Sequence, residues 1–555
     1  DPVSAGIGFE RFMAFLLDGV RLGGSDTFVD FQISRMQGED KEVSVTSPYS
    51  IKFVSGRKRF RGYQYSGNTL IRALDEHGHM NFLVGYKDER VVSFYNKRFP
   101  AEGRLGDEWK NLVNLDPDQE VSAEELSRIE RDAKISFLQK SGLVSKKGEV
   151  YFSFSYENIH QLNKLSKIIS IDHETTRDIA YAYANKKEFE NFLKEGIEYN
   201  IIPKEPLNFT NPSQNNWNYY PSYTEYTDMM QAFADSFPEI CKLHSIGTLS
   251  SGREILIVQI SDNVGIKENE PSFLYTSSMH GDELAGYILS LRLIDYILNG
   301  YNTQVRLTNI VNEIDLWINP LANPDGAYAG GNQNVWSATR NNANSIDLNR
   351  NYPDPQDGPH PDGNPWQDET LFFMGLADSI NFTIAANMHG GVEVANYPWD
   401  TWSRLTADDN WWTHIASHYA DTAHVNSSPG YFNDLNNGIT NGWDWYEVNG
   451  GRQDFMNYFK LCRESTLELS SNKIPNPTTL PYYWDANKRS LINYIKQSLY
   501  GLRGIVTDSL TGMPITAKVE ISGHDTDSSH VYSKEGVGNY HRYLFDGTYQ
   551  VTFSK

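Results

Sequence analysis

Short apolar runs alternate with helical segments from residue 217 to residue 500, and this order restricts the fold more than any other feature. Five of the runs are typical of strands, at residues 254–260, 271–278, 314–318, 383–386 and 466–469. The segments between them carry apolar residues at helical spacing. Such an alternation predicts an α/β domain with helices on both faces of the sheet. Sites in these sheets are built where strands end.

A histidine and a glutamate three positions apart stand at one such strand end. His280 and Glu283 follow the run 271–278 and precede an amphipathic helix at 284–293. Imidazole nitrogen and carboxylate oxygen are both zinc ligands. The pair is a weak signal by itself, because a His near a Glu is common in a chain of this length. The remainder of the chain must supply a third ligand and a base.

Four more polar clusters follow in order along the same block. They lie at residues 319–353, 387–400, 445–454 and 462–469. Together with 279–283, these motifs resemble the zinc metallocarboxypeptidase family, and most closely its regulatory, N/E-type subgroup. The resemblance covers residues 217–555. It implies a mixed sheet of the eight-stranded carboxypeptidase type, flanked by helices, and one zinc ion per catalytic domain.

The chain of 555 residues is too long for one core, so several domains are expected. Residues 1–147 stay unassigned, and 215–500 form the predicted catalytic domain. Residues 148–206 follow a β-α-β-α-β rhythm, with one strand expected across 171–183, and resemble the family's activation domain as an α+β unit. Residues 501–555 are expected to form an antiparallel β-sandwich that resembles a shortened transthyretin-like domain.

The resemblance implies a role for each motif residue. His280, Glu283 and His389 would hold the zinc ion and leave a fourth position for water. Asp347 would accept a hydrogen bond from His280 and fix its tautomer. A turn cap is the alternative role for Asp347.

Glu468 would be the general base. It lies within an apolar strand, where a carboxylate is costly unless it is paired or does chemistry. Glu464, four positions earlier, is the alternative candidate for the base. Arg340 would stabilise the oxyanion that develops beside the metal.

The side chains expected to bind the substrate follow from the same resemblance. Arg350 and Asn349 would clamp the terminal carboxylate, because a guanidinium matches a carboxylate with two parallel hydrogen bonds. Tyr446 would close over the bound residue. Asp400 stands eleven positions after His389, where the subgroup uses Asp to select basic side chains, and Gln453 also matches that subgroup. The expected activity is release of single C-terminal residues, with a preference for Lys and Arg; an ordinary loop role for Asp400 remains open.

Some features depart from the family pattern or compete with it. Asp282 replaces the Asn that is usual in the subgroup and adds a negative charge beside the metal. His414 and His418, with His424 nearby, have metal-ligand spacing but lack the His-Glu-x-x-His pattern. Asp354, Asp357 and Asp362 could bind calcium, although a solvated loop is favoured.

The first 147 residues carry weaker signals. Residues 6–17 resemble the third signature motif of class II aminoacyl-tRNA synthetases, with Arg11 at the position that contacts ATP, but a buried helix start is favoured. Residues 44–100 alternate like strands and include a basic cluster at 57–61. Residues 121–140 are typical of a charged helix.

The net charge of −22 argues against nucleic-acid and anionic-membrane partners. Cys241 and Cys462 allow one disulfide, and no apolar run reaches the roughly 18 residues of a membrane span. The chain begins at Asp1, which we interpret as a fragment or processed form. We expect a monomer that is secreted, periplasmic or on the cell surface and acts on peptide or protein C-termini.

Two other functions compete with this interpretation. A related zinc amidohydrolase, acting on cell-wall peptides or N-acyl amino acids, shares the His-x-x-Glu pair. A catalytically inactive module that captures C-termini is the second. Because the ligand, base and arginine positions are all filled, the sequence favours the peptidase.

Overall fold

The computed structural model describes residues 149–172, 175–176, 178–202 and 217–555, together with the backbone of five strands closer to the N-terminus. The chain divides into two compact units, residues 1–142 and 143–555. In the first unit the strands form one sheet in sequence order: β1 (Gly19–Val20), β2 (Phe31–Ile33), β3 (Ser47–Ser55), β4 (His79–Lys87) and β5 (Val92–Pro100).

Strands β3, β4 and β5 agree with the β-like alternation of residues 44–100. The expected helices at 6–17 and 121–140, Arg11, and the basic cluster 57–61 lie outside the described residues.

Residues 149–202 form a small layer of four strands and two helices, here called the 149–202 unit. Its elements are β6 (Val150–Ser155), α5 (Ile159–Ser166), β7 (Ser170–Ile171), β8 (Ile179–Ala184), α6 (Lys186–Lys194) and β9 (Tyr199–Ile201), and its sheet order is β7-β8-β6-β9. The single strand expected across 171–183 is wrong: β7 and β8 pair with each other antiparallel. The unit is therefore β-α-β-β-α-β.

The core of the 149–202 unit follows the period of its strands. Phe152 and Phe154 alternate with half-buried residues in β6 and meet Phe189 and Phe192 of α6. Asn185 caps α6 in a capping box with Glu188, which satisfies two backbone donors at the helix start.

An eight-stranded mixed sheet forms the centre of the catalytic domain, as the sequence predicts. Its order is β10-β11-β13-β12-β14-β17-β15-β16. The strands are β10 (Cys241–Thr248), β11 (Glu254–Ile260), β12 (Ser272–Ser277), β13 (Asp315–Asn319), β14 (Ile384–His389), β15 (Glu393–Tyr397), β16 (Ile439–Asn441) and β17 (Arg463–Leu469). β13, β12, β14 and β17 are mutually parallel, so their carboxyl ends lie at one edge.

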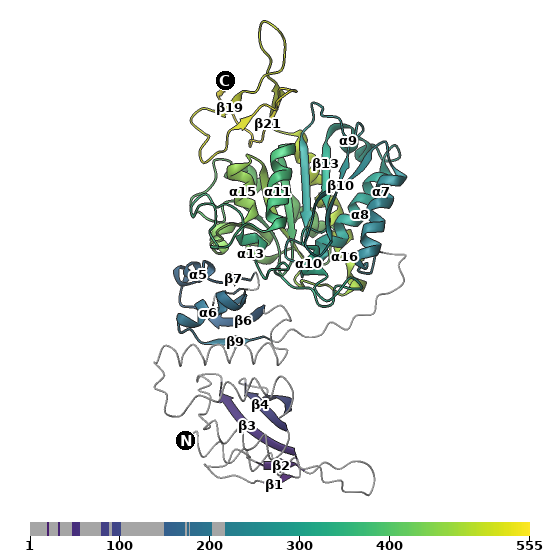
Figure 1. Ribbon diagram of the computed structural model, residues 1–555. Helices are drawn as coiled ribbons and strands as arrows, with labels where there is room; N and C mark the ends of the chain where they lie inside the picture. The colour runs from purple at the N-terminus through teal and green to yellow at the C-terminus, as the bar shows by residue number, and fades with distance from the viewer. Residues whose placement is uncertain are drawn as a thin grey trace. The chain divides into compact units, whose positions relative to one another are not determined.

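Helices cover both faces of this sheet (Figure 1). The first face packs against α7 (Tyr223–Ser236), α8 (Ala285–Gly300), α9 (Val305–Glu313), α12 (Asp409–Val425) and α16 (Leu480–Lys496). The second packs against α11 (Asp368–Ile380) and α15 (Arg452–Phe459). Neighbours in β12 show the alternation, since Phe273 and Tyr275 join the first core and Leu274 joins the second.

Short elements connect these layers. They are α10 (Pro324–Ala327), η2 (Leu348–Arg350), α13 (Asp434–Gly438), α14 (Gly442–Trp445), η3 (Pro477–Thr479) and η4 (Gln497–Leu499).

Residues 501–555 form two small antiparallel sheets. β18 (Leu502–Ile505) pairs with β21 (Asn539–Arg542), and β19 (Lys518–Ile521) lies between β20 (Val531–Tyr532) and β22 (Val551–Ser554). Val519, Val531 and Tyr540 supply the core. This segment is antiparallel, as the sequence predicts.

A buried aspartate ties this segment to the catalytic domain. Asp408 accepts hydrogen bonds from Arg463 and from both terminal nitrogens of Arg542, at 2.8–3.0 Å. Burial opposes the charged carboxylate, but Arg463 and Arg542 lower the pKa of Asp408 to about 2. The carboxylate is thus ionised and paired at neutral pH.

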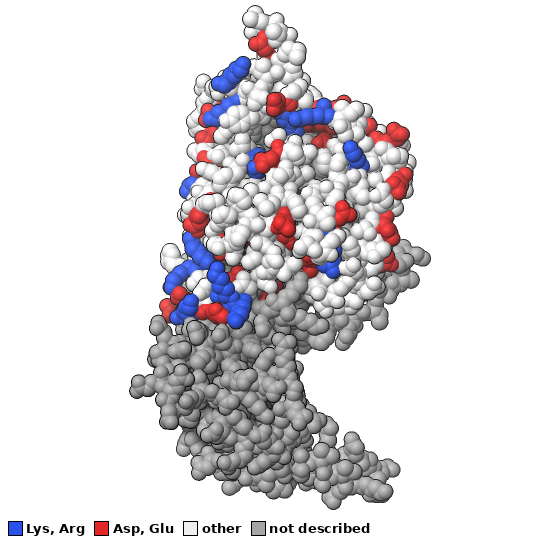
Figure 2. All heavy atoms as spheres, viewed as in Figure 1, with Lys and Arg blue, Asp and Glu red and all other residues white. Residues whose placement is uncertain are grey.

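The disulfide that the two cysteines would allow is not formed, since Cys241 and Cys462 are both buried and free. None of the helices in the described residues is long and apolar enough to cross a membrane. On the face in Figure 2, acidic side chains are scattered over the catalytic domain, whereas Lys and Arg gather around α5 and α6.

Candidate metal centre and substrate pocket

Three predicted metal ligands come together at the carboxyl edge of the sheet. His280 and Glu283 lie in the turn between β12 and α8, and His389 is the last residue of β14. β12 and β14 are parallel neighbours, so segments that follow them are adjacent in space. This pairing alone brings His280 and Glu283 close to His389, although more than one hundred residues separate them in the sequence.

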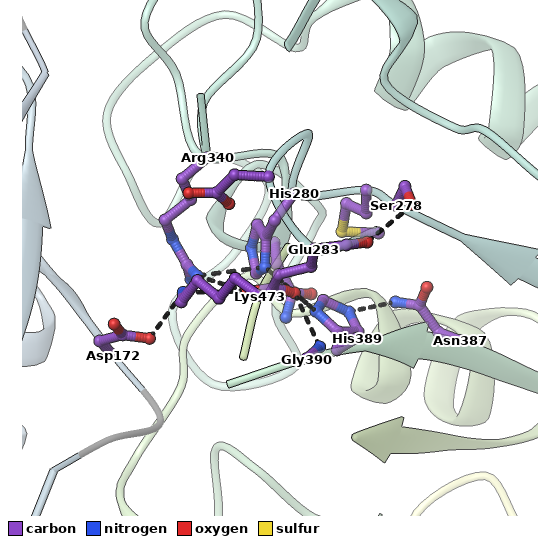
Figure 3. A network of polar contacts seen from close by, with 12 residues as sticks. Asp172, Ser278, His280, Glu283, Arg340, Asn387, His389, Gly390 and Lys473 are labelled. Atoms are coloured by element: carbon purple, nitrogen blue, oxygen red, sulfur yellow. Dashed lines mark hydrogen bonds and ion pairs between the residues drawn. The ribbon is translucent and has the colours of Figure 1, made fainter. Parts of the chain in front are cut away.

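The donor atoms of the three side chains converge on one point (Figure 3). The Nδ1 atoms of His280 and His389 lie 2.9 and 2.8 Å from Glu283 Oε2 and 3.0 Å from each other. All three residues are at most 1% exposed. Such lone pairs repel unless a cation or a proton lies among them, so this donor set fits a metal ion.

Outer partners orient both imidazoles. Asp347 Oδ1 lies 3.1 Å from His280 Nε2, and the Asn387 side-chain amide lies 2.8 Å from His389 Nε2. The Asp347 carboxylate accepts from His280 Nε2 and so turns the Nδ1 lone pair of His280 inward, and the Asn387 contact holds the His389 ring in place. Asp347 also accepts from the Asn349 backbone N–H at 2.8 Å, so it fills both roles weighed from the sequence. Burial lowers the pKa of His389 to about 4, which keeps the ring neutral and able to ligate.

The predicted base is adjacent to this cluster. Glu468 of β17 pairs in register with His389 of β14 and is fully buried. Burial and then the charge of Glu283 raise the pKa of Glu468 well above its usual range. Its rival Glu464 points elsewhere and accepts a hydrogen bond from Arg452 at 2.9 Å. The geometry therefore separates the two glutamates.

Arg340 lies against the metal ligands. Its Nη1 is 3.2 Å from Glu283 Oε1, and its Nε is 3.1 Å from Asp347 Oδ2. The side chain is fully buried. Burial opposes its charge, but Asp347 and Glu283 raise the pKa of Arg340 well above its ordinary value. A permanent positive charge thus stands beside the predicted metal.

A buried arginine with free donors lies on the neighbouring turn. Arg350 ends η2, is 7% exposed, and uses Nη1 for the carbonyl oxygen of Asn349 at 2.9 Å. Within the described part of the chain, its Nε and Nη2 have no hydrogen-bond partner. Unpaired donors of a buried guanidinium are costly, so this pair fits an anion such as a carboxylate.

Asp400 occupies a small buried pocket beyond β15. Its Oδ1 accepts from Asn396 Nδ2 and Gln453 Nε2, each at 3.0 Å. Gly442 leaves the space for this carboxylate, since a Cβ there would overlap Asp400 Oδ1. Burial raises the pKa of Asp400 to about 6. An anionic side chain with matching amide donors is therefore held in place within the domain core.

The 149–202 unit contacts this centre, which sequence reasoning did not anticipate. Asp172 lies 2.8 Å from Lys473 Nζ, and Lys473 in turn lies 3.1 Å from Glu283 Oε1 (Figure 3). The Tyr183 hydroxyl donates to Asp282 at 3.4 Å. The Tyr183 ring contacts two cations, with Lys473 Nζ 4.6 Å and the Arg340 guanidinium 5.4 Å from its centroid.

Two further contacts that involve backbone atoms join the 149–202 unit to the catalytic domain. The Tyr446 hydroxyl donates to the Ile171 carbonyl at 3.4 Å, and the Asn341 N–H donates to Glu149 at 3.0 Å. The pattern Ser-Ser-Asn-Lys around Lys473 gives no sequence signal for such a contact, because its partner Asp172 lies about three hundred residues away.

The side chains considered from the sequence as alternative metal sites each contact other groups. His424 of α12 bonds the Phe432 carbonyl at 2.7 Å, and His414 packs on Phe545. Asp354 accepts from Thr401 and from the Gly450 N–H, whereas Asp357 pairs with Lys167. These side chains serve separate partners and form no shared cation cluster among the described residues.

The sequence is similar to a known protein family and to several carboxypeptidases. The sequence profile of the family described as zinc carboxypeptidase matches residues 226–490. Mouse carboxypeptidase M is 35% identical over 343 residues, which are 58% of this chain and 75% of that protein. Mouse carboxypeptidase N catalytic chain is 35% identical over 358 residues, which are 57% and 76% of the two chains.

Rat carboxypeptidase D is 37% identical over 342 residues, 59% of this chain, but the match spans only 24% of that protein. A solved structure of carboxypeptidase A from Helicoverpa armigera aligns with a TM-score of 0.49 at 17% identity and covers 63% of this chain and 97% of that one.

Proposed function

Since this chain belongs to the zinc carboxypeptidase family, we propose that it releases single C-terminal residues from peptides or proteins and prefers Lys and Arg. The observation that carries the proposal is the convergence of the His280, Glu283 and His389 donor atoms beside a buried Glu468 and Arg340. Arg350 and Asp400 supply the recognition of a C-terminal basic residue.

Zinc held by His280, Glu283 and His389 would polarise the scissile carbonyl and lower the pKa of a water molecule. Glu468 accepts the proton of the attacking water and delivers it to the leaving amine. The raised pKa of Glu468 makes its carboxylate a stronger base for the first half of this transfer, and a metal cation bound nearby, which would stabilise the carboxylate, would favour release of the proton in the second half.

Arg340 binds the oxyanion that develops at the carbonyl carbon. Its guanidinium is already fixed by Glu283 and Asp347, so it pays little reorganisation when charge develops. Because Asp347 also orients His280, loss of that carboxylate would disturb both the ligand and the arginine.

Arg350 accounts for exopeptidase action in this proposal. Its two unpartnered donors would take the terminal carboxylate, with Asn349 alongside and Tyr446 over the bound residue. A peptide bond inside a chain offers no carboxylate to these donors. The zinc site would then act only one residue from a C-terminus.

Asp400 and Gln453 account for the basic preference. The carboxylate is held by two amide donors at 3.0 Å and is almost fully buried, so a Lys or Arg side chain would meet it away from solvent. Charged hydrogen bonds of this kind contribute about 1.5–3 kcal/mol. Apolar side chains would leave the Asp400 charge without a counterion.

We also infer that the 149–202 unit acts as an activation-type domain that restrains the enzyme. The metal ligands, the base and Arg340 are all at most 1% exposed, although a peptide end must reach them. Asp172, Tyr183 and Ile171 supply contacts to Lys473, Asp282 and Tyr446 at this entrance. Activity would require the unit to move away.

The test uses the full chain carrying Asp172→Asn, which weakens the contact that covers the site, and peptides that differ only in their last residue, Lys, Arg, Phe or Glu, with and without a zinc chelator. We expect chelator-sensitive release of Lys and Arg, abolished in the Glu468→Gln variant. Internal fragments as the only products, or a protein without zinc, would overturn the proposal. Release of an acyl group but of no C-terminal residue would favour the amidohydrolase.

A further inference from the structure

Lys473 is a buried cation that no step of the proposed reaction uses. Its side chain is 12% exposed, and its Nζ lies between Asp172 and Glu283 (Figure 3). The metal ligands, the base, the oxyanion donor and the carboxylate clamp are all other residues. When the 149–202 unit moves away, Lys473 loses Asp172 and keeps the contact with Glu283, a carboxylate that a metal ion would share.

The position of Lys473 indicates which part of a peptide it would meet. The Asp400 pocket lies beyond β15, toward the β16 edge of the sheet, and would hold the C-terminal side chain. Lys473 leaves β17 but returns to the β12 side, where its carbonyl accepts from the Leu284 N–H and its amine reaches Glu283. The metal ligands therefore lie between Asp400 and Lys473, and Lys473 faces residues upstream of the scissile bond.

The 149–202 unit supports this assignment because two of its consecutive residues span the entrance. The Ile171 carbonyl meets the Tyr446 hydroxyl, and the next residue, Asp172, places its carboxylate on Lys473. A peptide with its C-terminal residue under Tyr446 would span the same entrance in the opposite chain direction, with its penultimate residue near Lys473. The Asp172 carboxylate then stands where a side chain just upstream of the released residue would lie.

We propose that Lys473 is a specificity-determining residue that selects an acidic side chain at the penultimate position of the substrate. In the covered enzyme, the Asp172 carboxylate takes the position of that acidic side chain. This inference rests on the proposed carboxypeptidase function. A neutral side chain would leave the buried ammonium short of a partner, and a basic one would meet both Lys473 and Arg340.

The chemistry defines the substrate class as chains that end in Asp or Glu followed by Lys or Arg. Asp282 is a further anion near Lys473, and in the covered state its carboxylate accepts the Tyr183 hydroxyl at 3.4 Å. An anionic side chain of the substrate would take the contact with Lys473 that Asp172 makes at 2.8 Å.

The experiment compares three peptides, identical except for endings Glu-Arg, Gln-Arg and Lys-Arg, in the full chain carrying Asp172→Ala. We expect kcat/KM for Glu-Arg to exceed that for Gln-Arg by about tenfold or more, as for a hydrogen bond between charged groups. The ratio should fall to about one with Lys473→Met and persist with Lys473→Arg.

A binding assay separates this inference from the proposed function. In the zinc-loaded full chain with Asp172→Ala and Glu468→Gln, the same peptides are titrated by calorimetry, and the Glu-Arg peptide should bind about tenfold more tightly. Hydrolysis of all three peptides at equal rates, or a ratio unchanged in Lys473→Met, overturns the role of Lys473 but leaves the peptidase intact. Absence of both cleavage and binding overturns both.

Discussion

Neutralising Asp172 should activate the full-length enzyme, and the structure sets the size of the effect. Asp172 is fully buried and contacts Lys473 Nζ at 2.8 Å. The Asp172→Asn variant keeps the shape of the side chain and removes its charge. Lys473 retains Glu283 at 3.1 Å, so the loss is that of one charged hydrogen bond, about 1.5–3 kcal/mol.

That loss weakens only the covered state, because Asp172 has no role once the unit has moved. The equilibrium between covered and open enzyme would shift by roughly 10- to 150-fold. At substrate concentrations below KM, release of C-terminal Arg should rise by up to the same factor, until the open form predominates. The intrinsic kcat of the open form should not change, since Asp172 lies outside the reacting groups.

Asp357→Asn is the matched control. It removes a second ion pair between the 149–202 unit and the catalytic domain, with Lys167 at 3.0 Å, but both side chains are 30% exposed or more. An exposed pair contributes about 0–1 kcal/mol, so activation should stay below about fivefold. Equal rates for Asp172→Asn and the parent across all substrate concentrations would refute the idea that this pair holds the site closed.

Three further predictions follow from named contacts. Glu468→Gln should lower kcat by about 10²- to 10⁴-fold while zinc content, measured by elemental analysis, stays at one per chain; loss of zinc would make Glu468 a ligand instead of a base. Asp400→Asn should reduce kcat/KM for Arg-ending peptides by roughly 10- to 150-fold and spare Phe-ending ones. Because burial raises the pKa of Asp400 to about 6, the parent's preference for Arg over Phe should also decline as pH falls below 6, and a ratio constant from pH 8 to pH 5 would contradict this role. Asp408→Ala should destabilise the protein by about 3–5 kcal/mol in denaturant unfolding, because it leaves Arg463 buried without its carboxylate partner and Arg542 with Asp525 alone. Asp527→Asn, which breaks an exposed pair with Arg404, should cost about 0–1 kcal/mol, and equal effects of the two variants would refute the distinction.

The sheet was predictable because it depends on local patterns, whereas the metal ligands were identified through the resemblance to a known family. Each strand carries its own apolar run, and His280 and His389 each stand at the end of such a run. Parallel pairing of β12 with β14 then brings them together without further information. The alternation and the ends of the strands thus determine where the donors meet.

The number of cysteines allowed one disulfide but could not decide whether it forms, because residue counts contain no spatial distance. Cys241 begins β10 at one edge of the sheet, and Cys462 immediately precedes β17, five positions away in the strand order. At about 4.8 Å between strands, the separation is roughly 24 Å, far beyond the reach of a disulfide. Both thiols are instead packed in the core.

The contacts of the 149–202 unit were not predictable for a different reason. Asp172 and Tyr183 lie in a segment whose own pattern suggested one strand, and the reversal between β7 and β8 is what sends Asp172 and Tyr183 to the same centre. Lys473 lies in a polar turn after β17. Such contacts depend on docking of two separate folds, and neither partner shows it in its own periodicity.

Asp282 gains a physical role from this docking. In an open site its charge would stand beside the metal ligands with water as its main partner. In the covered state it is 2% exposed and accepts the Tyr183 hydroxyl at 3.4 Å, while Tyr183 also packs over Lys473 and Arg340. The negative charges of Asp282 and Asp172 therefore offset the positive charges that the aromatic ring covers. A neutral residue at position 282 would leave Lys473 and Arg340 with one fewer nearby anion in a place from which water is excluded. The negative charge of Asp282 therefore favours the covered state over the open one.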